Sequence, residues 1–382
     1  MTLTIRHYIV LALFFATMIT SIWPDNIYLL FTFSLANLFF ININIKNDKA
    51  FFCLFLFSCF YCLNQYATVG IGSGFVFVST LIAPISFYKF GCWLMDWMQE
   101  DRQRLNFLFC MFLCYLLPVL LLTIQDMILV GFINESRRLL SDIGKEDTTL
   151  AATLYGLMGS TGIGFVAILF SSRLKILKKI LYFSVCVISV LIIIHLVNRT
   201  GLVLLASCIL FSFVNSTRFK PSKLIITTLL LLIAFFVIIK FGLIPKDVID
   251  AYLMREDSAT TNASEYGGRT VLWRDALSNI LTHPFGWKRL KYAHNLWLDL
   301  AAVGGWISLV FFFTATLVSI KCFFKTMHQK LTPFKSVLLT VYLSMMLNSM
   351  DEPVIEGSLL FFVLLILIWS MVISASKEYY NI

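Results

Sequence analysis

Long apolar segments recur along the whole chain and alternate with short polar turns. Twelve of them approach the ~20 residues that an α-helix needs to cross a bilayer. Because the bilayer core has no water to satisfy backbone N–H and C=O groups, such segments must form helices or closed barrels. The sequence lacks strands of alternating polarity, so the pattern predicts an all-α polytopic membrane protein with about 12 transmembrane helices. The predicted spans lie at roughly 8–22, 27–44, 50–66, 72–90, 105–124, 149–170, 180–197, 200–216, 224–244, 295–320, 336–350 and 358–375.

Composition supports a single integral membrane domain over residues 1–382. Only 13% of the residues are charged and 59% are hydrophobic, whereas a soluble domain of this length carries about 25% charged residues. The nine cysteines form neither a disulfide framework nor a Cys/His metal pattern. The sequence also lacks a D-x-D pair, a P-loop and a G-x-S-x-G elbow. We therefore expect no metal and no cofactor.

Positive charge predicts the orientation of the chain. If the N-terminus is cytoplasmic, the inner loops hold eighteen Lys and Arg residues, and the short outer loops hold four, namely Arg137, Arg138, Lys145 and Arg199. This asymmetry obeys the positive-inside rule. It accounts for most of the net charge of +9, so a nucleic-acid partner is not expected.

One long polar region interrupts the spans near the C-terminus. Residues 245–294 lie between predicted helices 9 and 10, on the predicted outer side, and contain seven Lys/Arg, six Asp/Glu and two His. Within it we predict a short helix at about 268–282, opened by Gly267-Gly268 and ended by His283-Pro284. A second segment, 247–255, is weakly helical. A cluster of cations at the membrane surface favours the binding of an anion.

Three residues are candidates for chemistry on that anion. Arg269 falls in the first turn of the predicted helix, where helix amides and a guanidinium together favour phosphate. The alternative is a loop arginine paired with Glu265 or Asp275. Arg199 lies at the outer boundary of two spans, where it either faces a binding cavity or snorkels. His294 can accept a proton near neutral pH, or it can be an ordinary interfacial histidine.

Further residues can support these three. Asn295 either contacts substrate or caps the following span. Asp299, one turn into that span, can orient His294 or its neighbours. Candidates for a wider cationic surface are Arg274, Arg137 and Arg138, although such residues are commonly only solvated. His195, within a span, is more typical of a packed or hydrogen-bonded side chain, and His283 of a turn residue.

The ordered motifs over residues 198–305 resemble the O-antigen ligase and polymerase superfamily of bacterial envelope glycosyltransferases. The matching pieces are Asn198-Arg199-Thr200-Gly201-Leu202, Gly268-Arg269 with Trp273-Arg274-Asp275-Ala276, His283-Pro284-Phe285-Gly286, His294-Asn295-Leu296-Trp297-Leu298 and Gly304-Gly305. Two positions depart from the family pattern. Trp287 replaces a second glycine that often follows Pro-x-Gly, and the stretch from Asp299 to Gly304 stands where ligases often carry Glu-x-Gly. The second departure favours a polymerase over a ligase.

The resemblance implies an inverting, metal-independent glycosyltransferase in the bacterial inner membrane, with its active site facing the periplasm. Its donor would be a glycan on undecaprenyl pyrophosphate, held by Arg199 and Arg269, while His294 would orient or deprotonate the acceptor hydroxyl. A polymerase would transfer the growing chain onto the next lipid-linked repeat unit, usually beside a chain-length regulator protein. The spans would form a groove for the polyprenyl tail among membrane lipids. The three catalytic candidates are therefore expected to converge.

Three other functions are compatible with the same pattern. A ligase would transfer the glycan to lipid A-core with the same chemistry. A lipid-linked glycan flippase would place its charged residues inside the spans along a path, whereas here they gather outside. A non-catalytic membrane scaffold is the remaining alternative.

Overall fold

The structure of the protein is a computed structural model. The described residues are 4–23, 26–43, 48–68, 70, 74–133, 138–142, 145–171, 174–216, 269–287, 292–351 and 354–377. Three predicted features therefore lie outside the described residues: the span 224–244, the weak helix 247–255 and the Gly267-Gly268 helix opening. Arg137 lies outside them as well.

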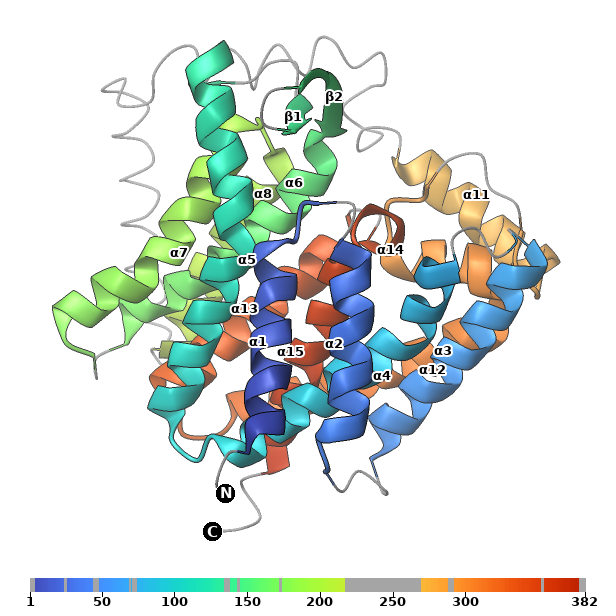
Figure 1. Ribbon diagram of the computed structural model, residues 1–382, viewed down its shortest axis with the longest axis horizontal. Helices are drawn as coiled ribbons and strands as arrows, with labels where there is room; N and C mark the ends of the chain where they lie inside the picture. The colour runs from blue at the N-terminus through green and yellow to red at the C-terminus, as the bar shows by residue number, and fades with distance from the viewer. Residues whose placement is uncertain are drawn as a thin grey trace. The chain divides into compact units, whose positions relative to one another are not determined.

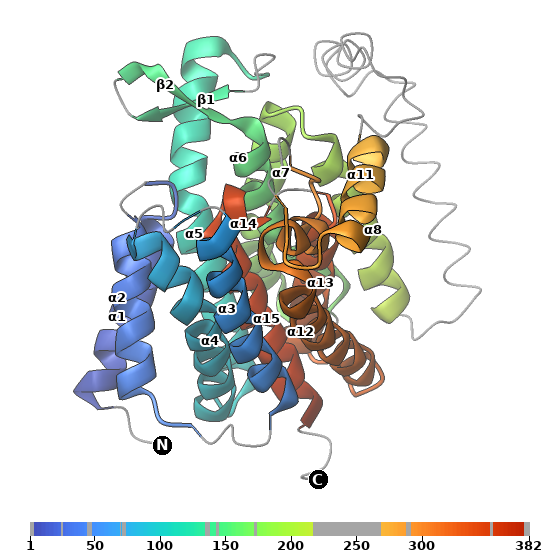
Figure 2. The ribbon, with the colours of Figure 1, turned by 90° about the vertical axis from the view of Figure 1, so that its right-hand side faces the viewer.

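The chain divides into two compact units (Figure 1). Unit 1 comprises Met1–Pro118, Gly268–Lys330 and Met345–Ile382. Its elements are α1 (Ile5–Ile19), α2 (Asn26–Phe40), α3 (Lys49–Thr68), α4 (Gly74–Trp97), the first part of α5 (Asp101–Val130), α11 (Arg269–Thr282), α12 (Leu296–Met327), α14 (Val354–Gly357) and α15 (Leu359–Lys377). Helices α3 and α12 run side by side in this unit, as do α4 and α15 (Figure 2).

Unit 2 comprises Val119–Gly267 and Leu331–Ser344. It contains the rest of α5 and most of α13, together with β1 (Arg138–Asp142), β2 (Lys145–Ala151), α6 (Ala152–Gly159), the 3-10 helix η1 (Ser160–Phe170), α7 (Ile176–His195) and α8 (Arg199–Ser216). Helix α13 runs from Pro333 to Ser349. The 3-10 helix packs against both α7 and α8.

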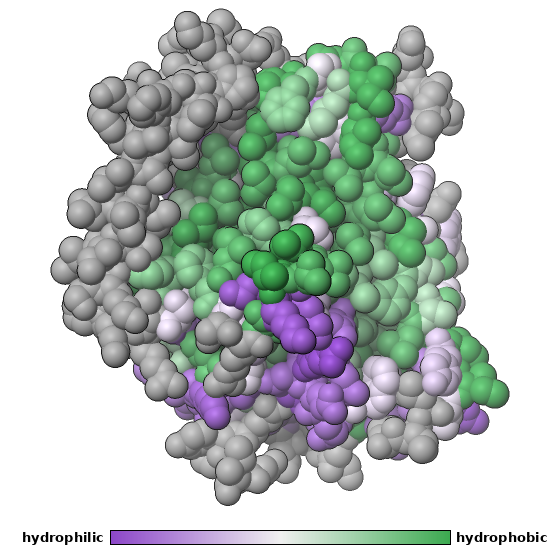
Figure 3. Space-filling view, turned by 90° about the vertical axis from the view of Figure 1, so that its left-hand side faces the viewer, coloured by the Kyte–Doolittle hydropathy of each residue, from purple (hydrophilic) through white to green (hydrophobic). Residues whose placement is uncertain are grey.

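The predicted helical membrane fold is confirmed. Seven described helices are long and apolar enough to cross a membrane, and Ile5–Ile19, Asn26–Phe40 and Leu154–Phe170 are shorter apolar helical segments. Hydrophobic side chains cover much of the described surface on the face shown in Figure 3, and a hydrophilic patch lies toward its lower edge. The expectation of one integral domain stays a prediction.

Aromatic side chains from four helices form a buried cluster in unit 1. Phe14 of α1 lies 4.8 Å from Phe90 of α4 by ring centroid, and Phe33 of α2 lies 5.0 Å from Phe87 of α4. Phe107 of α5 joins the cluster. Tilted and edge-on rings at these separations are the favoured arrangement of aromatic pairs. The many Phe residues therefore serve helix packing as well as lipid contact.

The predicted span 149–170 is wrong as a continuous α-helix. Its first residues belong to β2, which pairs antiparallel with β1 in the register Leu139↔Leu150, a short hairpin that the apolar pattern did not predict. Backbone groups of the two strands hydrogen-bond to one another in this antiparallel pair. The last part is the 3-10 helix, in which a Cβ on Gly164 would come within 2.5 Å of the Val341 backbone of α13. Small residues permit this close approach between helices.

Candidate functional site

The predicted short helix of the polar region is present as α11, and Arg269 is its first residue. The Nη1 atom of Arg269 forms an ion pair with Oδ1 of Asp351 at 2.5 Å, and the two side chains are only 19% and 9% exposed. Asp351 follows α13 in the sequence. Glu265, one of the two expected partners, lies outside the described residues. A guanidinium at the first residue of a helix lies where the unsatisfied amides also favour an anion.

One face of α11 faces the segment that leads into α12. Trp273 donates a hydrogen bond from Nε1 to the carbonyl oxygen of Ala293 at 2.8 Å, and Ala276 is buried. Arg274 is exposed, whereas Arg269 is half-buried. The two arginines therefore lie on different faces of α11, as their five-residue spacing predicts.

The turn His283-Pro284-Phe285-Gly286 docks against a break in α12. The break is at Gly305, with φ 66° and ψ −171°. The backbone groups it frees are satisfied from outside the helix: the Trp306 amide donates to the Pro284 carbonyl at 2.8 Å, and Nδ2 of Asn64 on α3 donates to the Gly304 carbonyl at 2.6 Å. The Trp287 amide in turn donates to the Ala302 carbonyl at 2.7 Å. The His283-Pro284-Phe285-Gly286 motif and the Gly304-Gly305 motif thus contact each other in the structure.

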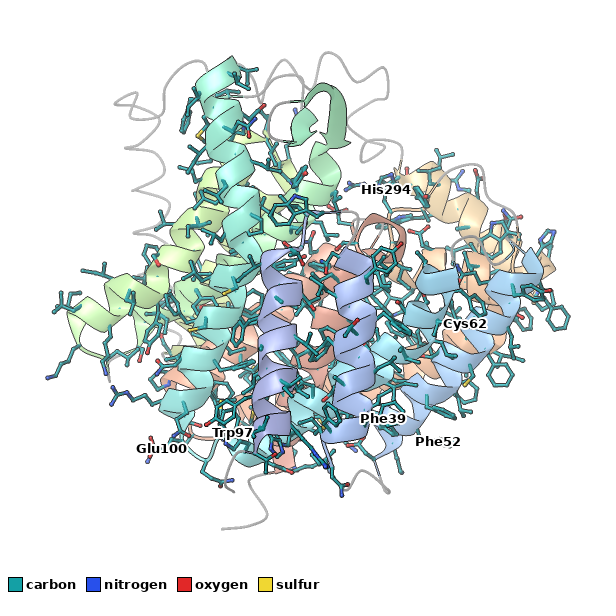
Figure 4. All side chains as sticks on the ribbon, in the orientation of Figure 1. Phe39, Phe52, Cys62, Trp97, Glu100 and His294 are labelled. Atoms are coloured by element: carbon teal, nitrogen blue, oxygen red, sulfur yellow. The ribbon has the colours of Figure 1, made fainter. Side chains whose placement is uncertain are left out.

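His294 lies at the entry to α12 (Figure 4) and has a left-handed backbone, with φ 55°. The amides on both sides of it donate to the same carboxylate: Ala293 to Oδ1 of Asp299 at 2.8 Å, and Asn295 to Oδ2 of Asp299 at 3.2 Å. Asp299 is buried. It therefore holds the backbone around His294 in a conformation that a non-glycine residue rarely adopts.

Asn295 caps α12, because its Oδ1 accepts from the amides of Trp297 at 3.2 Å and Leu298 at 3.3 Å. Its Nδ2 also donates to the Met350 carbonyl at 3.3 Å. Through Met350, the residue next to Asp351, the entry to α12 is connected to the partner of Arg269. We call Arg269, His294, Asn295, Asp299 and Asp351 the α11–α12 cluster. All of it belongs to unit 1.

Arg199 belongs to unit 2, where it begins α8 and is exposed. Asn198 before it is buried, and its Oδ1 accepts from the Gly201 amide at 3.0 Å, so it caps α8. A Cβ on Gly156 would overlap Nδ2 of Asn198, and a Cβ on Gly201 would come within 2.7 Å of Ile193. Asn198 and Gly201 of the Asn-Arg-Thr-Gly motif thus have local structural roles. The convergence of Arg199 with Arg269 and His294 stays a prediction.

His195 and Asp126 form a buried pair, of which the sequence indicated only the histidine. The interpretation of His195 as hydrogen-bonded is confirmed, since its Nε2 lies 2.8 Å from Oδ2 of Asp126. No local pattern indicated Asp126, because it lies in α5, 69 positions before His195.

Two other candidate residues can also be located in the structure. Arg138 is the first residue of β1, and His283 is an exposed turn residue beside Thr282, with 2.8 Å between its Nδ1 and the threonine Oγ1.

Among the described residues, no group of three or more His, Cys, Asp or Glu side chains could hold a metal ion. The expected independence from metals stays a prediction, since most of the long polar region lies outside the described residues.

The fold and the cluster define a helical membrane protein with a cationic residue and a histidine held at the ends of α11 and α12. Residues 184–288 match the family described as O-antigen ligase. The match includes Arg199, Arg269 and Arg274, and it confirms the resemblance to the O-antigen ligase and polymerase superfamily over this stretch. His294 and Asp299 follow the matched residues. No curated protein matches the chain.

Proposed function

We propose that this protein is an O-antigen polymerase, a glycosyltransferase that joins oligosaccharide repeat units carried on undecaprenyl pyrophosphate at the periplasmic face of the inner membrane. The observation that carries the proposal is the α11–α12 cluster. It links a guanidinium at a helix N-terminus to a histidine through two contacts, Arg269 with Asp351 and Asn295 with Met350. The family match to residues 184–288 supports the same chemistry.

The proposed reaction inverts the configuration of the donor sugar. The oxygen of the acceptor hydroxyl attacks C1 of that sugar, and the bond between C1 and the pyrophosphate oxygen breaks on the opposite face. The electron pair leaves with undecaprenyl pyrophosphate, and the hydroxyl proton passes to the imidazole of His294. Negative charge grows on the departing oxygen, where Arg269 and the first amides of α11 stabilise it.

Asp351 has a defined place in this scheme. Its carboxylate neutralises Arg269 while the donor is absent, which lowers the cost of keeping a half-buried guanidinium. An incoming pyrophosphate then shares or takes over the same donor groups. The second cation for the pyrophosphate would be Arg199, and a chain-length regulator remains the expected protein partner.

A ligase is the second candidate, because the matched family is described as O-antigen ligase. The donor, the leaving group and the roles of Arg269 and His294 would be the same, and only the acceptor would change to lipid A-core. We favour the polymerase because Asp299 and the residues after it replace the Glu-x-Gly pattern frequent in ligases.

Glycan profiling on a gel tests the proposal. A strain lacking the gene is complemented with wild type, Arg269→Ala or His294→Ala at equal protein level. We expect the ladder of wild type to collapse to one repeat unit on core in both variants, because losing an oxyanion donor or a general base costs about 100-fold or more in rate. Arg102→Ala and His328→Ala, at exposed positions of α5 and at the end of α12, are the matched controls and should keep the ladder.

The other outcomes separate the alternatives. Loss of all core-attached glycan with accumulation of lipid-linked polymer would identify a ligase. Unchanged ladders in both variants would remove the catalytic role of the α11–α12 cluster and favour transport.

A further inference from the structure

A carboxylate–imidazole pair is buried in unit 2, at the ends of two helices. His195 is the last residue of α7 and Asp126 lies in the last turns of α5. His195 is 0% exposed and Asp126 is 3% exposed. The Nε2 atom of His195 lies 2.8 Å from Oδ2 of Asp126, and its Nδ1 lies 2.8 Å from the carbonyl oxygen of Phe132, just past the end of α5. One imidazole therefore joins the end of α7 to two points on the outer end of α5.

The hydrogen-bond chemistry fixes how many protons the pair holds. A carbonyl oxygen can only accept, so Nδ1 must carry a hydrogen. Two acceptor atoms do not face each other at 2.8 Å, so a hydrogen also lies between Nε2 and Oδ2 of Asp126. Both ring nitrogens are therefore engaged in hydrogen bonds. This arrangement holds the ring in one orientation.

The chain between this ring and Arg199 is short and fixed at both ends. Val197 has a left-handed backbone with φ 49°, and the Asn198 amide donates to the Ile193 carbonyl at 3.0 Å. Asn198 then caps α8 through the Gly201 amide. Three residues separate His195 from Arg199, and two of them are held in defined conformations. We call residues 196–198 the α7–α8 corner. A shift of the imidazole would be transmitted through this corner to the start of α8.

Direct contact of His195 with a substrate is excluded by its complete burial. Stability alone also gives a poor account of the pair, because buried polar pairs are often no more stabilising than apolar side chains of the same volume. The pair instead fixes the end of α7 relative to the end of α5. The exposed Arg199 directly follows this corner.

We propose that Asp126 and His195 are positioning residues that set the α7–α8 corner and thereby the direction in which Arg199 is presented to the substrate pyrophosphate. This inference rests on the role of Arg199 in the proposed function. It adds Asp126, which no motif includes, to the residues on which donor binding depends.

Steady-state kinetics of the full-length protein in lipid nanodiscs test the proposal, with an undecaprenyl-pyrophosphate-linked repeat unit as donor. Asp126→Ala should raise the KM for the donor about 10-fold, because misplacing a binding group by a fraction of an ångström to 1 Å weakens the productive complex by 10- to 100-fold. Asp126→Asn should stay within about 3-fold of wild type, because its amide can still donate to Nε2 of a neutral imidazole.

Controls separate positioning from loss of fold. Val185→Ala removes buried volume from the same helix, where Val185 is 0% exposed, and it should lower the amount of folded protein without changing the KM. In an Arg199→Lys background, Asp126→Ala should add little further rise in KM, since two changes acting on one interaction are not additive. If Asp126→Ala does not fold, His195→Gln carries the test: it keeps a donor toward Asp126, loses the one toward Phe132, and should raise the KM.

Failure of the positioning role and failure of the proposed function give different results. If Arg199→Ala raises the KM and the folded Asp126 and His195 variants do not, the positioning role is overturned and the proposed function stands. If the effects of Asp126→Ala and Arg199→Lys multiply in full, the pair does not act through Arg199. If Arg199→Ala leaves the kinetics unchanged, the role of Arg199 in the proposed function is overturned, and this inference with it.

Discussion

At the scale of single residues, one carboxylate determines the backbone on both sides of His294. Asp299 accepts from the amides of Ala293 and Asn295 at 2.8 and 3.2 Å, and the residue between them has φ 55°. A left-handed non-glycine residue costs roughly 1 kcal/mol or more and persists only where its surroundings impose it. Hydrogen bonds to Asp299, one helical turn away, therefore stabilise the unusual backbone conformation of His294.

Substitution of Asp299 should affect glycan assembly in proportion to the hydrogen bonds lost. Asp299→Ala loses both acceptors and should reduce polymer output at least 10-fold, since each hydrogen bond to a charged group contributes about 1.5–3 kcal/mol. Asp299→Asn keeps one acceptor but turns an NH₂ toward an amide donor, so we expect an intermediate output. Ladder intensity at matched protein level is the measurement. Exposed Asp275→Asn on α11 is the control, and equal output from all variants would contradict the positioning role.

At the scale of elements, the break in α12 and the turn after α11 depend on two glycines with positive φ. Gly286 has φ 92° and Gly305 has φ 66°. A Cβ on Gly286 would lie 2.6 Å from the Ala302 carbonyl oxygen, and one on Gly305 would lie 2.5 Å from the Pro284 carbonyl oxygen. Glycine is needed here both for the dihedral angle and for the close approach of two backbones.

Gly286→Ala should therefore lower the free energy of unfolding more than positive φ alone explains. We expect a loss of about 2–4 kcal/mol, combining roughly 1 kcal/mol for the left-handed backbone with about 1–3 kcal/mol for overpacking. Thermal unfolding in detergent measures it. Gly70→Ala is the matched control, since Gly70 has φ 88° and no described atom within 4 Å of its Cβ position. Equal losses in the two variants would show that the contact between this turn and α12 tolerates a side chain.

At the scale of the molecule, a second set of contacts ties the two ends of unit 1 together. Asp48 caps α3 by accepting from the amides of Ala50 and Phe51 at 3.1 and 3.2 Å. It also accepts from Tyr88 of α4 at 2.8 Å and from Nζ of Lys377 at the end of α15 at 2.9 Å. Residues 329 positions apart are thus joined on the side predicted to be cytoplasmic.

The pKa of Asp48 predicts how this contact responds to acid. Burial raises the pKa, but the hydrogen bonds from Lys377 and Tyr88 and the charge of Lys377 outweigh it, so the pKa lies below its ordinary value of 3.8. A lowered folded-state pKa contributes stability above pH 3.8 that is lost as the pH falls below it. Asp48→Asn should abolish this acid-dependent loss.

Thermal unfolding in detergent between neutral and strongly acidic pH measures the effect. Asp48→Asn should cost about 1 kcal/mol at neutral pH, a figure kept small because the Lys377 end of the pair is solvent-exposed. Its unfolding temperature should then fall less steeply with acid than that of wild type. Asp275→Asn is the control, and parallel curves for Asp48→Asn and wild type would contradict the prediction.

Some features of this protein follow from local patterns in the sequence. The length of the apolar segments predicts helices, because a backbone without water must hydrogen-bond within its own segment. Helix α11 has nearly the predicted bounds, and it ends directly before His283-Pro284, as the sequence predicts. The cap at Asn295 likewise follows from one residue type at the start of an apolar run.

Other features were decided by contacts between segments far apart in the chain. The sequence does not pair Asp126 with His195, or Asp351 with Arg269, because an acidic residue carries no local mark of its distant partner. Helical periodicity also missed the β1–β2 hairpin and the 3-10 helix, which depend on strand pairing and on close approach to α13. Local hydrogen bonding thus determined the elements, and tertiary packing alone decided which charged side chains meet.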